Sequence, residues 1–335
     1  MKIAVFETEE WEHRACLALE SEHALQCTRE ALRAATAATY SNAEILSPFV
    51  NSKLDATVLG MFPRLKFIAT RSTGYDHIDL GVCAARGITV SNVPDYGDAT
   101  VAEHTFALLL AVARHLVEAV ERTRHGNFSQ TGLRGIELRE KTIGVIGTGR
   151  IGRRAIEIAK GFGMTVVAFD TRPNQAHAAQ LGFQYRSLDE VLAQADFITL
   201  HVPSTTATVG MLSDRQFSMM KRDVVIINTA RGNVIDIPAL VRALSDGRVG
   251  AVGLDVLPQE PLIREEAVIF RSSDPAGYDL KALVANHVLL RFPNVLVTPH
   301  IAYNTESAVR RIIDITLDNI RAFSNGAPQN IVSRK

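Results

Sequence analysis

Three polar residues stand where the sequence places the ends of successive strands. Arg231 follows a β-branched run in NTARGNVID, and its planar guanidinium can form a two-pronged hydrogen-bonded pair with a carboxylate. Glu260 follows the next run in PQEPL, and His300 ends the last one in VTPHIAYNT. Each residue alone is more typical of an ion pair, a loop acid or a satisfied polar group. Together they indicate a site that orients a hydride acceptor and supplies it with a proton.

The stretch VIGTGRIGRR (145–154) contains glycines at the spacing that is typical of dinucleotide-binding loops. Gly147, Gly149 and Gly152 fill the pattern G-x-G-x-x-G between an expected strand and an expected helix. Glycines let backbone amides approach a pyrophosphate, and the helix N-terminus adds a favourable positive potential. Arg150 and Ile151 lie on the same loop. The stretch therefore predicts a dinucleotide site near the middle of the chain.

Asp170 ends the strand after this loop, about 20 residues beyond the glycines. A carboxylate there can accept hydrogen bonds from the ribose hydroxyls and repels a 2′-phosphate, which favours NAD over NADP. Arg172 leaves the alternative open, since a nearby arginine can accommodate that phosphate. The other residues that contact the cofactor are expected at the carboxyl ends of later strands. They are Val202, Pro203, Thr229, Ala230 and Asp255.

Strands and helices alternate along the chain, which is typical of parallel sheets with helices on their faces. The later series predicts a doubly wound sheet of about six strands. Its strands are expected at 142–147, 164–170, 196–203, 223–232, 250–257 and 294–300, with helices at 151–162, 174–181, 236–246 and 304–323. An earlier series has strands at 2–6, 43–49, 65–71 and 87–93 and helices at 9–20, 79–86 and 101–124. Residues 258–293 are expected to form a surface excursion with a helix.

Length and composition narrow the class of protein. A chain of 335 residues predicts two domains with a cleft between them. Lysine plus arginine equals aspartate plus glutamate at 36 each, so no excess of positive charge favours a nucleic-acid partner. Three cysteines without a C-x-x-C pair fit a reducing compartment, with no disulfide and no metal site. Without a signal peptide or a long apolar span, we expect a cytoplasmic protein with no membrane partner.

Several stretches resemble the NAD-dependent D-2-hydroxyacid dehydrogenases, and within that family they most resemble the D-lactate dehydrogenase subgroup. They cover nearly the whole chain: RSTGYDHIDL (71–80), VSNVPDYGDATVAEHTFALLL (90–110), GVIGTGRIG (144–152), LHVPSTTAT (200–208), INTARGNVID (227–236), GLDVLPQEPL (253–262) and NVLVTPHIAYNT (294–305). The ordered triplet of arginine, glutamate and histidine is the most specific part of the resemblance.

The resemblance implies reversible reduction of a small 2-oxo acid, such as pyruvate, with NADH. Arg231 would bind the substrate carboxylate and polarise the keto group, His300 would be the acid and base, and Glu260 would hold His300 in its charged form. Thr208 would join the cofactor site. The other substrate contacts that it implies are the loop Ser72, Thr73 and Gly74 and the pocket residues Phe49, Val50, Tyr96 and Tyr303.

The resemblance also implies how the chain is divided. Residues 1–100 with 301–335 would form a discontinuous substrate domain, and residues 101–300 would form the NAD-binding Rossmann domain. The fold would then be two Rossmann-like doubly wound parallel-sheet domains. The helix at 101–124 would lie in the interface of a homodimer.

Two other functions stay open. A glyoxylate or hydroxypyruvate reductase of the same family would share every catalytic residue. An NAD-sensing scaffold resembling the C-terminal binding protein corepressors would keep the fold and the triplet without serving as an enzyme. The residues of the stretches RSTGYDHID and AYNT favour the lactate subgroup. Two histidines have no assigned role, because His104 is expected on a helix face and His201 has no identified partner.

Overall fold

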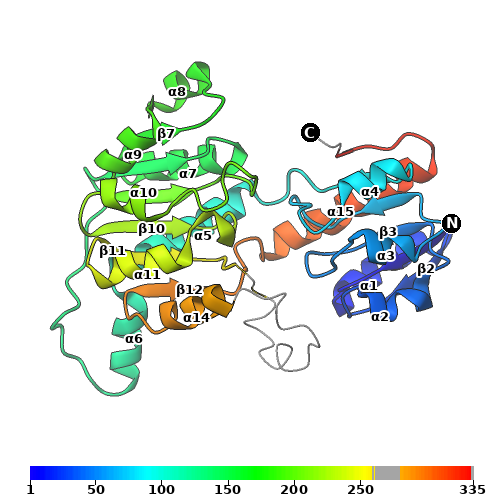
Figure 1. Ribbon diagram of the computed structural model, residues 1–335, viewed down its shortest axis with the longest axis horizontal. Coiled ribbons are helices and arrows are strands. Elements are labelled where there is room, and N and C mark those ends of the chain that lie inside the picture. The colour runs from blue at the N-terminus through cyan, green and yellow to red at the C-terminus, as the bar shows by residue number, and fades with distance from the viewer. Residues whose placement is uncertain (259, 261–279, 333–335) are drawn as a thin grey trace. The chain divides into compact units, whose positions relative to one another are not determined.

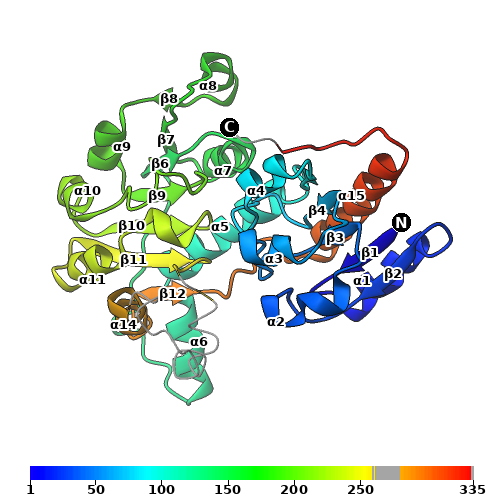
Figure 2. The ribbon, with the colours of Figure 1, turned by 45° about the vertical axis from the view of Figure 1, so that its right-hand side comes forward.

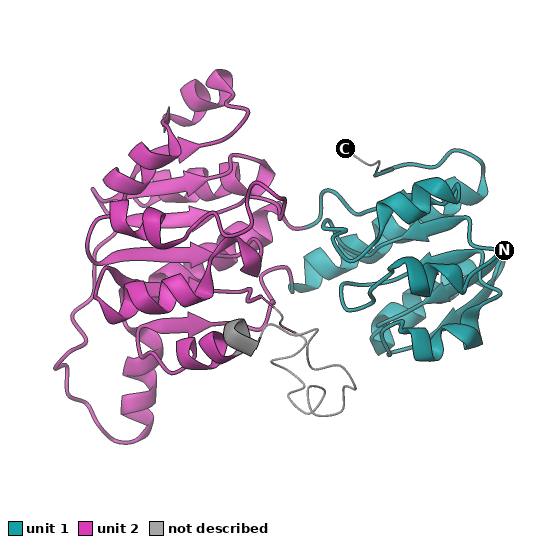
Figure 3. Cartoon of the chain, viewed as in Figure 1, with its two compact units in different colours: residues 1–96, 304–335 teal, residues 97–303 magenta. Residues whose placement is uncertain are grey.

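All strand pairs in the two sheets are parallel, and each sheet belongs to a separate compact unit. The computed structural model describes residues 1–258, 260 and 280–332. Unit 1 comprises residues 1–96 and 304–335, and unit 2 comprises residues 97–303 (Figures 1 and 3). Unit 2 is thus inserted into the chain of unit 1. The prediction of an α/β protein with parallel sheets is confirmed.

Unit 1 contains a five-stranded sheet in the order β2-β1-β3-β4-β5. The inner strands are short and buried on both faces, as their runs of apolar residues indicate. The strands are β1 Lys2–Val5, β2 Ala24–Cys27, β3 Ile45–Ser47, β4 Phe67–Ala69 and β5 Thr89–Ser91. The helices are α1 Glu10–Cys16, α2 Ala34–Ala37, α3 Ala56–Gly60, α4 Leu80–Ala85 and α15 Glu306–Ser324.

Successive strand residues of unit 1 point to opposite faces, and each face has its own hydrophobic core. Ile45 and Phe67 face α1 and α15, whereas Leu46 and Ile68 face α2, α3 and α4. The α15 side includes buried Ile313, Leu317 and Ile320 from the last helix of the chain. The C-terminal helix therefore completes a core that begins at the N-terminus.

Unit 2 contains a seven-stranded sheet in the order β12-β11-β10-β9-β6-β7-β8, one strand more than expected because β8 was not predicted. The strands are β6 Thr142–Ile146, β7 Thr165–Phe169, β8 Gln184–Tyr185, β9 Phe197–Leu200, β10 Val224–Asn228, β11 Val249–Leu254 and β12 Val295–Val297. The helices are α5 Asp98–Ala113, α6 Leu116–Arg124, α7 Arg150–Gly161, α8 Gln175–Leu181, α9 Leu188–Gln194, α10 Asp214–Met219, α11 Ile237–Ser245 and α14 Leu280–Leu289.

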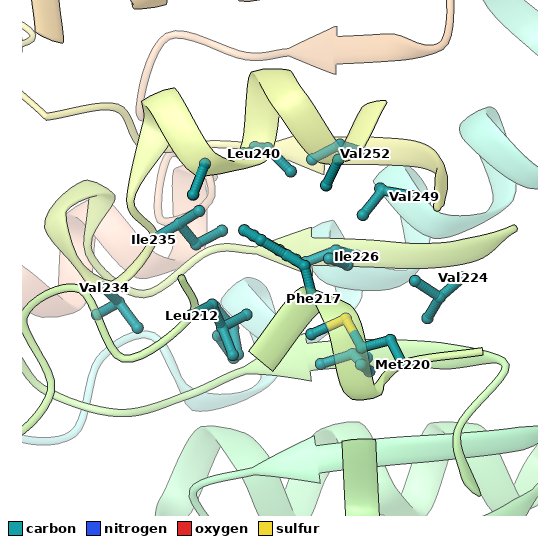
Figure 4. Packing of buried hydrophobic residues seen from close by; sticks show 14 of the residues in the cluster. Leu212, Phe217, Met220, Val224, Ile226, Val234, Ile235, Leu240, Val249 and Val252 are labelled. Atoms are coloured by element: carbon teal, nitrogen blue, oxygen red, sulfur yellow. The ribbon is translucent and has the colours of Figure 1, made fainter. Parts of the chain in front are cut away.

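Helices cover both faces of this sheet. One core joins α9, α10 and α11 to the sheet, with Phe217 and Leu240 packed on Ile226 and Val252 (Figure 4). The other core joins α5, α7 and α8 to the opposite face, and Figure 2 shows α5 and α7 together on that side of the strands. The chain reverses its strand order between β6 and β9, which are neighbours in the sheet. Ligands of such sheets bind at that point, outside the carboxyl ends of the strands.

The expected helix at 101–124 is wrong as a single element. The chain forms α5 and α6, which meet at 61° across His115 in the left-handed region (φ 49°). The segment after α6 explains why α5 ends at Ala113. The Ile136 N–H of this segment donates to the Ala113 carbonyl (2.8 Å). A Cβ on Gly135 would lie 2.6 Å from the same oxygen, so glycine permits this close approach. No single helix among the described residues is long and apolar enough to cross a membrane.

The segment expected to be an excursion, 258–293, contains α14 at its end. Its residues 259 and 261–279 lie outside the described residues. In unit 1 the strand β2 was not expected, β1 is one residue shorter than expected, and β3, β4 and β5 are each four residues shorter. The residues beyond their ends, such as Phe49 and Arg71, belong to loops at the carboxyl edge of the sheet.

Candidate active site

The glycine loop of unit 2 has a shape that other residues cannot take. Gly147 directly follows β6 and has a φ of +94°, in the region that favours glycine. A Cβ there would lie 2.5 Å from the His201 carbonyl oxygen, and a Cβ on Gly152 would overlap the carbonyl oxygen of Gly147. The loop therefore packs closely on itself and on the end of β9.

The middle glycine differs, since no atom lies within 4 Å of a Cβ built on Gly149. Open space in front of this residue and the N-terminus of the 12-residue helix α7 fit a pyrophosphate, which the backbone amides would approach. Beside it, Arg150 Nε donates to Asp98 Oδ2 at 2.7 Å, at the start of α5. Ile151 is partly buried against the core of the α5 face.

Asp170 is tied to the glycine loop by its own hydrogen bonds. Its Oδ2 accepts from Thr148 N (2.7 Å) and Thr148 Oγ1 (2.8 Å), and its Oδ1 accepts from Arg172 N (2.8 Å). Partial burial opposes the charge, but these donors together hold the pKa of the Asp170 carboxyl below its usual value. Asp170 is therefore a carboxylate at neutral pH. It borders a pocket of about 360 Å³ lined by Phe169, Pro173, Tyr185, Arg186, Ser187 and Glu190.

The other cofactor candidates of unit 2 lie at carboxyl strand ends, as expected. Val202 and Pro203 follow β9, where Val202 packs at Gly147 and the Pro203 carbonyl accepts from Thr208 Oγ1 (2.6 Å). Thr229 and Ala230 follow β10, and Ala230 N donates to Asn228 Oδ1.

His201 has a partner that the sequence did not reveal. Its Nε2 lies 3.0 Å from Thr199 Oγ1, and its side chain packs near Gly152. Burial lowers the pKa of the His201 imidazole to about 4. The residue is therefore a neutral packing element beneath the glycine loop.

Glu260 and His300 form a hydrogen-bonded pair. Nδ1 of His300 lies 2.9 Å from Glu260 Oε2, and both side chains are partly exposed. Glu260 Oε1 accepts from Leu257 N, so the carboxylate is itself oriented. His300 has a φ of 56°, a left-handed conformation that costs a non-glycine residue about 1 kcal/mol. The pair borders a pocket of about 180 Å³ lined also by Asp255, Leu257, Leu290, Val297, Thr298 and Pro299.

Asp255 fixes the backbone on both sides of His300. Its carboxylate is buried and accepts from Thr298 Oγ1 (2.6 Å), Ile301 N (2.9 Å) and Ala302 N (2.8 Å). Burial opposes its charge, but these donors and His104 hold the pKa of the Asp255 carboxyl below its usual value. His104 lies on a face of α5, as expected, and its Nε2 lies 3.0 Å from Thr298 Oγ1.

Arg231 stands at the end of β10, next to β11 in the sheet order, and β11 in turn neighbours β12. Parallel strands bring the segments after all three to one edge, so the topology places Arg231, Glu260 and His300 on neighbouring connections. The guanidinium is oriented by a hydrogen bond from Nη1 to the Ala230 carbonyl (2.8 Å).

The loop 72–74 lies at the corresponding edge of unit 1, after β4. Ser72 Oγ donates to the Gly74 carbonyl (2.6 Å), and Thr73 Oγ1 donates to the Val93 carbonyl (2.7 Å). Within the described part of the chain, the backbone N–H groups of these three residues donate to no other residue. Such a loop can receive an anion. Tyr96 and Tyr303 stand at the two points where the chain passes between the units.

Two residues that sequence reasoning did not single out organise this edge of unit 1. Arg71 is 1% exposed, and its guanidinium donates to the carbonyls of Phe6 (2.6 Å), Glu7 (2.9 Å) and Ser47 (3.3 Å). Glu7 accepts from the backbone N–H groups of Phe49 and Asn51. Phe49 is partly buried and lies under the Arg71 guanidinium, whereas Val50 is exposed. Arg71 stands first in RSTG, but nothing local indicates that its side chain turns inward.

A doubly wound sheet whose glycine loop faces open space at a helix N-terminus is typical of a domain that binds a dinucleotide. Residues 106–302 match the family model for the NAD-binding domain of the D-isomer specific 2-hydroxyacid dehydrogenases. The chain belongs to this family, and its cofactor is NAD.

Relatives extend the likeness to nearly the whole chain. D-lactate dehydrogenase from Escherichia coli is 35% identical over 97% of this chain and 98% of its own length. A glyoxylate reductase from Aeropyrum pernix is 35% identical over 88% of this chain and 84% of its own. A solved structure of D-lactate dehydrogenase from Aquifex aeolicus, in complex with NAD and lactic acid, is 34% identical, covers 99% of both chains and has a TM-score of 0.89.

The glycine loop yields a first prediction. We expect Gly149→Ala to keep the melting temperature of the free protein within about 2 °C, because its Cβ meets no atom, but to weaken NADH binding at least tenfold. Gly152→Ala should instead lower the free energy of unfolding by about 1–3 kcal/mol, since the Gly147 carbonyl must move. Calorimetry and NADH titration measure both effects. Unchanged NADH affinity in Gly149→Ala would show that no pyrophosphate approaches this residue.

The buried imidazole yields a second prediction. In the unfolded chain His201 takes up a proton below its ordinary pKa of 6.5, whereas the folded protein resists this until about pH 4. Stability should therefore fall as the pH drops from about 6.5 to 4, and His201→Gln should reduce that fall. Melting temperatures across this range measure it, with the exposed His13→Gln as control. Equal pH dependence in wild type and His201→Gln would contradict the burial of a neutral ring.

Proposed function

We propose that the protein reduces a small, pyruvate-like 2-oxo acid to the D-2-hydroxy acid with NADH, the reaction of a D-lactate dehydrogenase. The observation that carries this proposal is the 2.9 Å contact between Glu260 and His300 at the sheet edge where Arg231 also lies. This arrangement combines a proton donor, a carboxylate that orients it and a cation for an acidic substrate.

The glycine loop would hold the pyrophosphate of NAD, and Asp170 would meet the adenosine ribose. Asp170 already accepts three hydrogen bonds from Thr148 and Arg172, and a carboxylate has about four acceptor positions. Its negative charge would exclude a 2′-phosphate. Bound NADH supplies the hydride. The other residues proposed to hold it are Arg150, Ile151, Val202, Pro203, Thr208, Thr229, Ala230 and Asp255.

Arg231 would bind the substrate carboxylate through its planar guanidinium and polarise the keto oxygen. In unit 1, the N–H groups of Ser72, Thr73 and Gly74 are proposed as substrate contacts, since they donate to no other described residue and can receive an anion. The other proposed substrate contacts are Phe49, Val50 and Tyr96 of unit 1 and Tyr303 of unit 2.

His300 would deliver the proton to the keto oxygen and remove it in the reverse reaction. The carboxylate of Glu260 can only accept, so Nδ1 of His300 carries a hydrogen and Nε2 is the nitrogen that exchanges a proton with substrate. Glu260 would orient the ring for this step through the same contact.

A glyoxylate or hydroxypyruvate reductase is the second candidate, because the Aeropyrum pernix relative carries that activity in its name. The lactate activity is favoured by the fuller coverage of the Escherichia coli relative, 97% against 88% of this chain. A corepressor-like scaffold is the third and would lack rapid turnover. A cytoplasmic location stays a prediction.

We also propose a homodimer that uses α6. No residue of this helix is buried, and Leu116, Val117 and Val120 expose 54%, 47% and 39% of their surface. Apolar side chains gathered on one exposed helix are typical of an interface.

A substrate panel tests the activity. With NADH, kcat/KM for pyruvate should exceed that for glyoxylate and for hydroxypyruvate at least tenfold, and NADPH should support less than a tenth of the NADH rate because of the charge on Asp170. Faster reduction of glyoxylate would make the protein a glyoxylate reductase. No turnover of any 2-oxo acid would favour the scaffold.

Variants of the triplet test the roles. We expect His300→Ala to lower kcat by about 10²–10⁴, the usual effect of losing a positioned general acid. Arg231→Gln should raise KM for the oxo acid by about tenfold or more and lower kcat, and Arg231→Lys should do less damage because it keeps the charge. The α8 variant His177→Ala is the control. Normal kinetics in both Arg231 variants would remove this residue from the site.

Light scattering tests the assembly. Val117→Glu places a charge on the exposed side of α6 and should shift the protein from dimer to monomer at micromolar concentration. The exposed Val209→Glu, on a loop, is the matched control. A monomeric wild type would contradict the proposal.

A further inference from the structure

Helix α5 contacts three segments of the candidate site within unit 2. At the start of the helix, Asp98 pairs with Arg150 of the glycine loop. About two turns later, the neighbouring side chains of His104 and Thr105 contact the segments that carry His300 and Arg231. These contacts are Thr105 Oγ1 to Thr229 Oγ1 at 2.9 Å and His104 Nε2 to Thr298 Oγ1 at 3.0 Å.

The hydrogens of the His104 contact can be assigned from chemistry. The carboxylate of Asp255 only accepts, so the single hydrogen of the Thr298 hydroxyl lies in its 2.6 Å contact with Asp255. Thr298 Oγ1 must therefore accept from His104, and Nε2 of His104 carries a hydrogen. The same Nε2 lies 3.4 Å from Asp255 Oδ1. A directed chain of hydrogen bonds thus runs from α5 to the buried carboxylate.

This chain ends on the backbone that holds the proposed acid. Asp255 accepts from Ile301 N and Ala302 N, directly after His300. His300 itself has a strained left-handed backbone, which persists only where its surroundings fix it. A shift of Asp255 would therefore move the imidazole relative to Glu260.

The helix is a firm base for this chain. Thr105, Leu108 and Leu109 are buried in the core between α5 and the sheet. Thr105 Oγ1 donates to the Val101 carbonyl, so the Thr229 hydroxyl donates to Thr105. Thr229 stands two residues before Arg231. The segments that carry Arg231 and His300 both contact this one rigid helix, which therefore fixes the distance between them.

We infer that His104 is a positioning residue of the reaction: through Thr298 and Asp255 it holds segment 298–302, and with it His300, at a fixed place on α5. This inference rests on the proposed function. His104 acts on the proton-transfer step more than on binding, because the glycine loop and Arg231 have their own contacts. Of the residues proposed to hold NAD, only Asp255 belongs to this chain of hydrogen bonds.

Kinetics separate this role from a general effect on stability. His104→Leu removes the donor and Thr298→Val removes the hydroxyl, and each should lower kcat about tenfold or more while KM for the oxo acid and the Kd of NADH stay within about threefold. His104→Gln and Thr298→Ser keep the polar atom and should restore kcat to within about threefold of the wild type. The double variant His104→Leu/Thr298→Val should be no slower than the worse single variant, since both break one chain.

Hydrogen exchange of the ligand-free protein supplies a readout that needs no activity. Peptides covering 298–303 should exchange at least tenfold faster in His104→Leu and Thr298→Val than in wild type, and the Gln and Ser variants should resemble wild type. Glu103→Gln, on the exposed neighbour of His104, is the control. Unchanged exchange, or faster exchange with normal kcat, would overturn the inference. A wild type that reduces no 2-oxo acid would instead overturn the proposed function, while exchange would still test the hold of His104 on the segment.

Discussion

A parallel sheet sends the carboxyl ends of all its strands to one edge, and both units of this protein depend on that constraint. In unit 2 the glycine loop, Asp170, Arg231 and His300 come from distant parts of the chain but follow strands of one sheet. In unit 1 the loops after β1, β3 and β4 meet in the same way. Pairing fixes the strand ends, on both sides for β6, β7 and β10 and on one side for the edge strand β12. The hydrogen bonds of Asp170, Glu260 and Asp255 then orient the residues beyond those ends.

Both edges also contain a buried charge that is satisfied by backbone groups. Asp255 receives two backbone N–H groups in unit 2, and Arg71 donates to three carbonyls in unit 1. An ionised side chain without such partners would cost several kcal/mol on burial. Each charge therefore strongly favours one arrangement of the loops around it, and those loops carry the residues proposed to meet the substrate.

The sequence predicted these sites to the extent that their signals are local. The glycine spacing and the strand-end residues Arg231, Glu260 and His300 are readable because a short motif includes both the residue and the element that positions it. The contact of His104 was not predicted because its partner Thr298 is 194 residues away and the helix pattern indicates only its face. The break after α5 was missed for the same reason, since it depends on Gly135 approaching Ala113. Strand β8, with two residues, has too little pattern to detect.

The insertion of unit 2 into unit 1 determines the order in which a growing chain can fold. Residues 97–303 contain every strand of the second sheet, so that unit can be completed once they have left the ribosome. The first sheet is synthesised earlier, yet the core that Ile45 and Phe67 share with Ile313, Leu317 and Ile320 must wait for the last helix. During most of synthesis the N-terminal strands therefore have one apolar face covered by α1 alone, and the segment made first is the one that matures last.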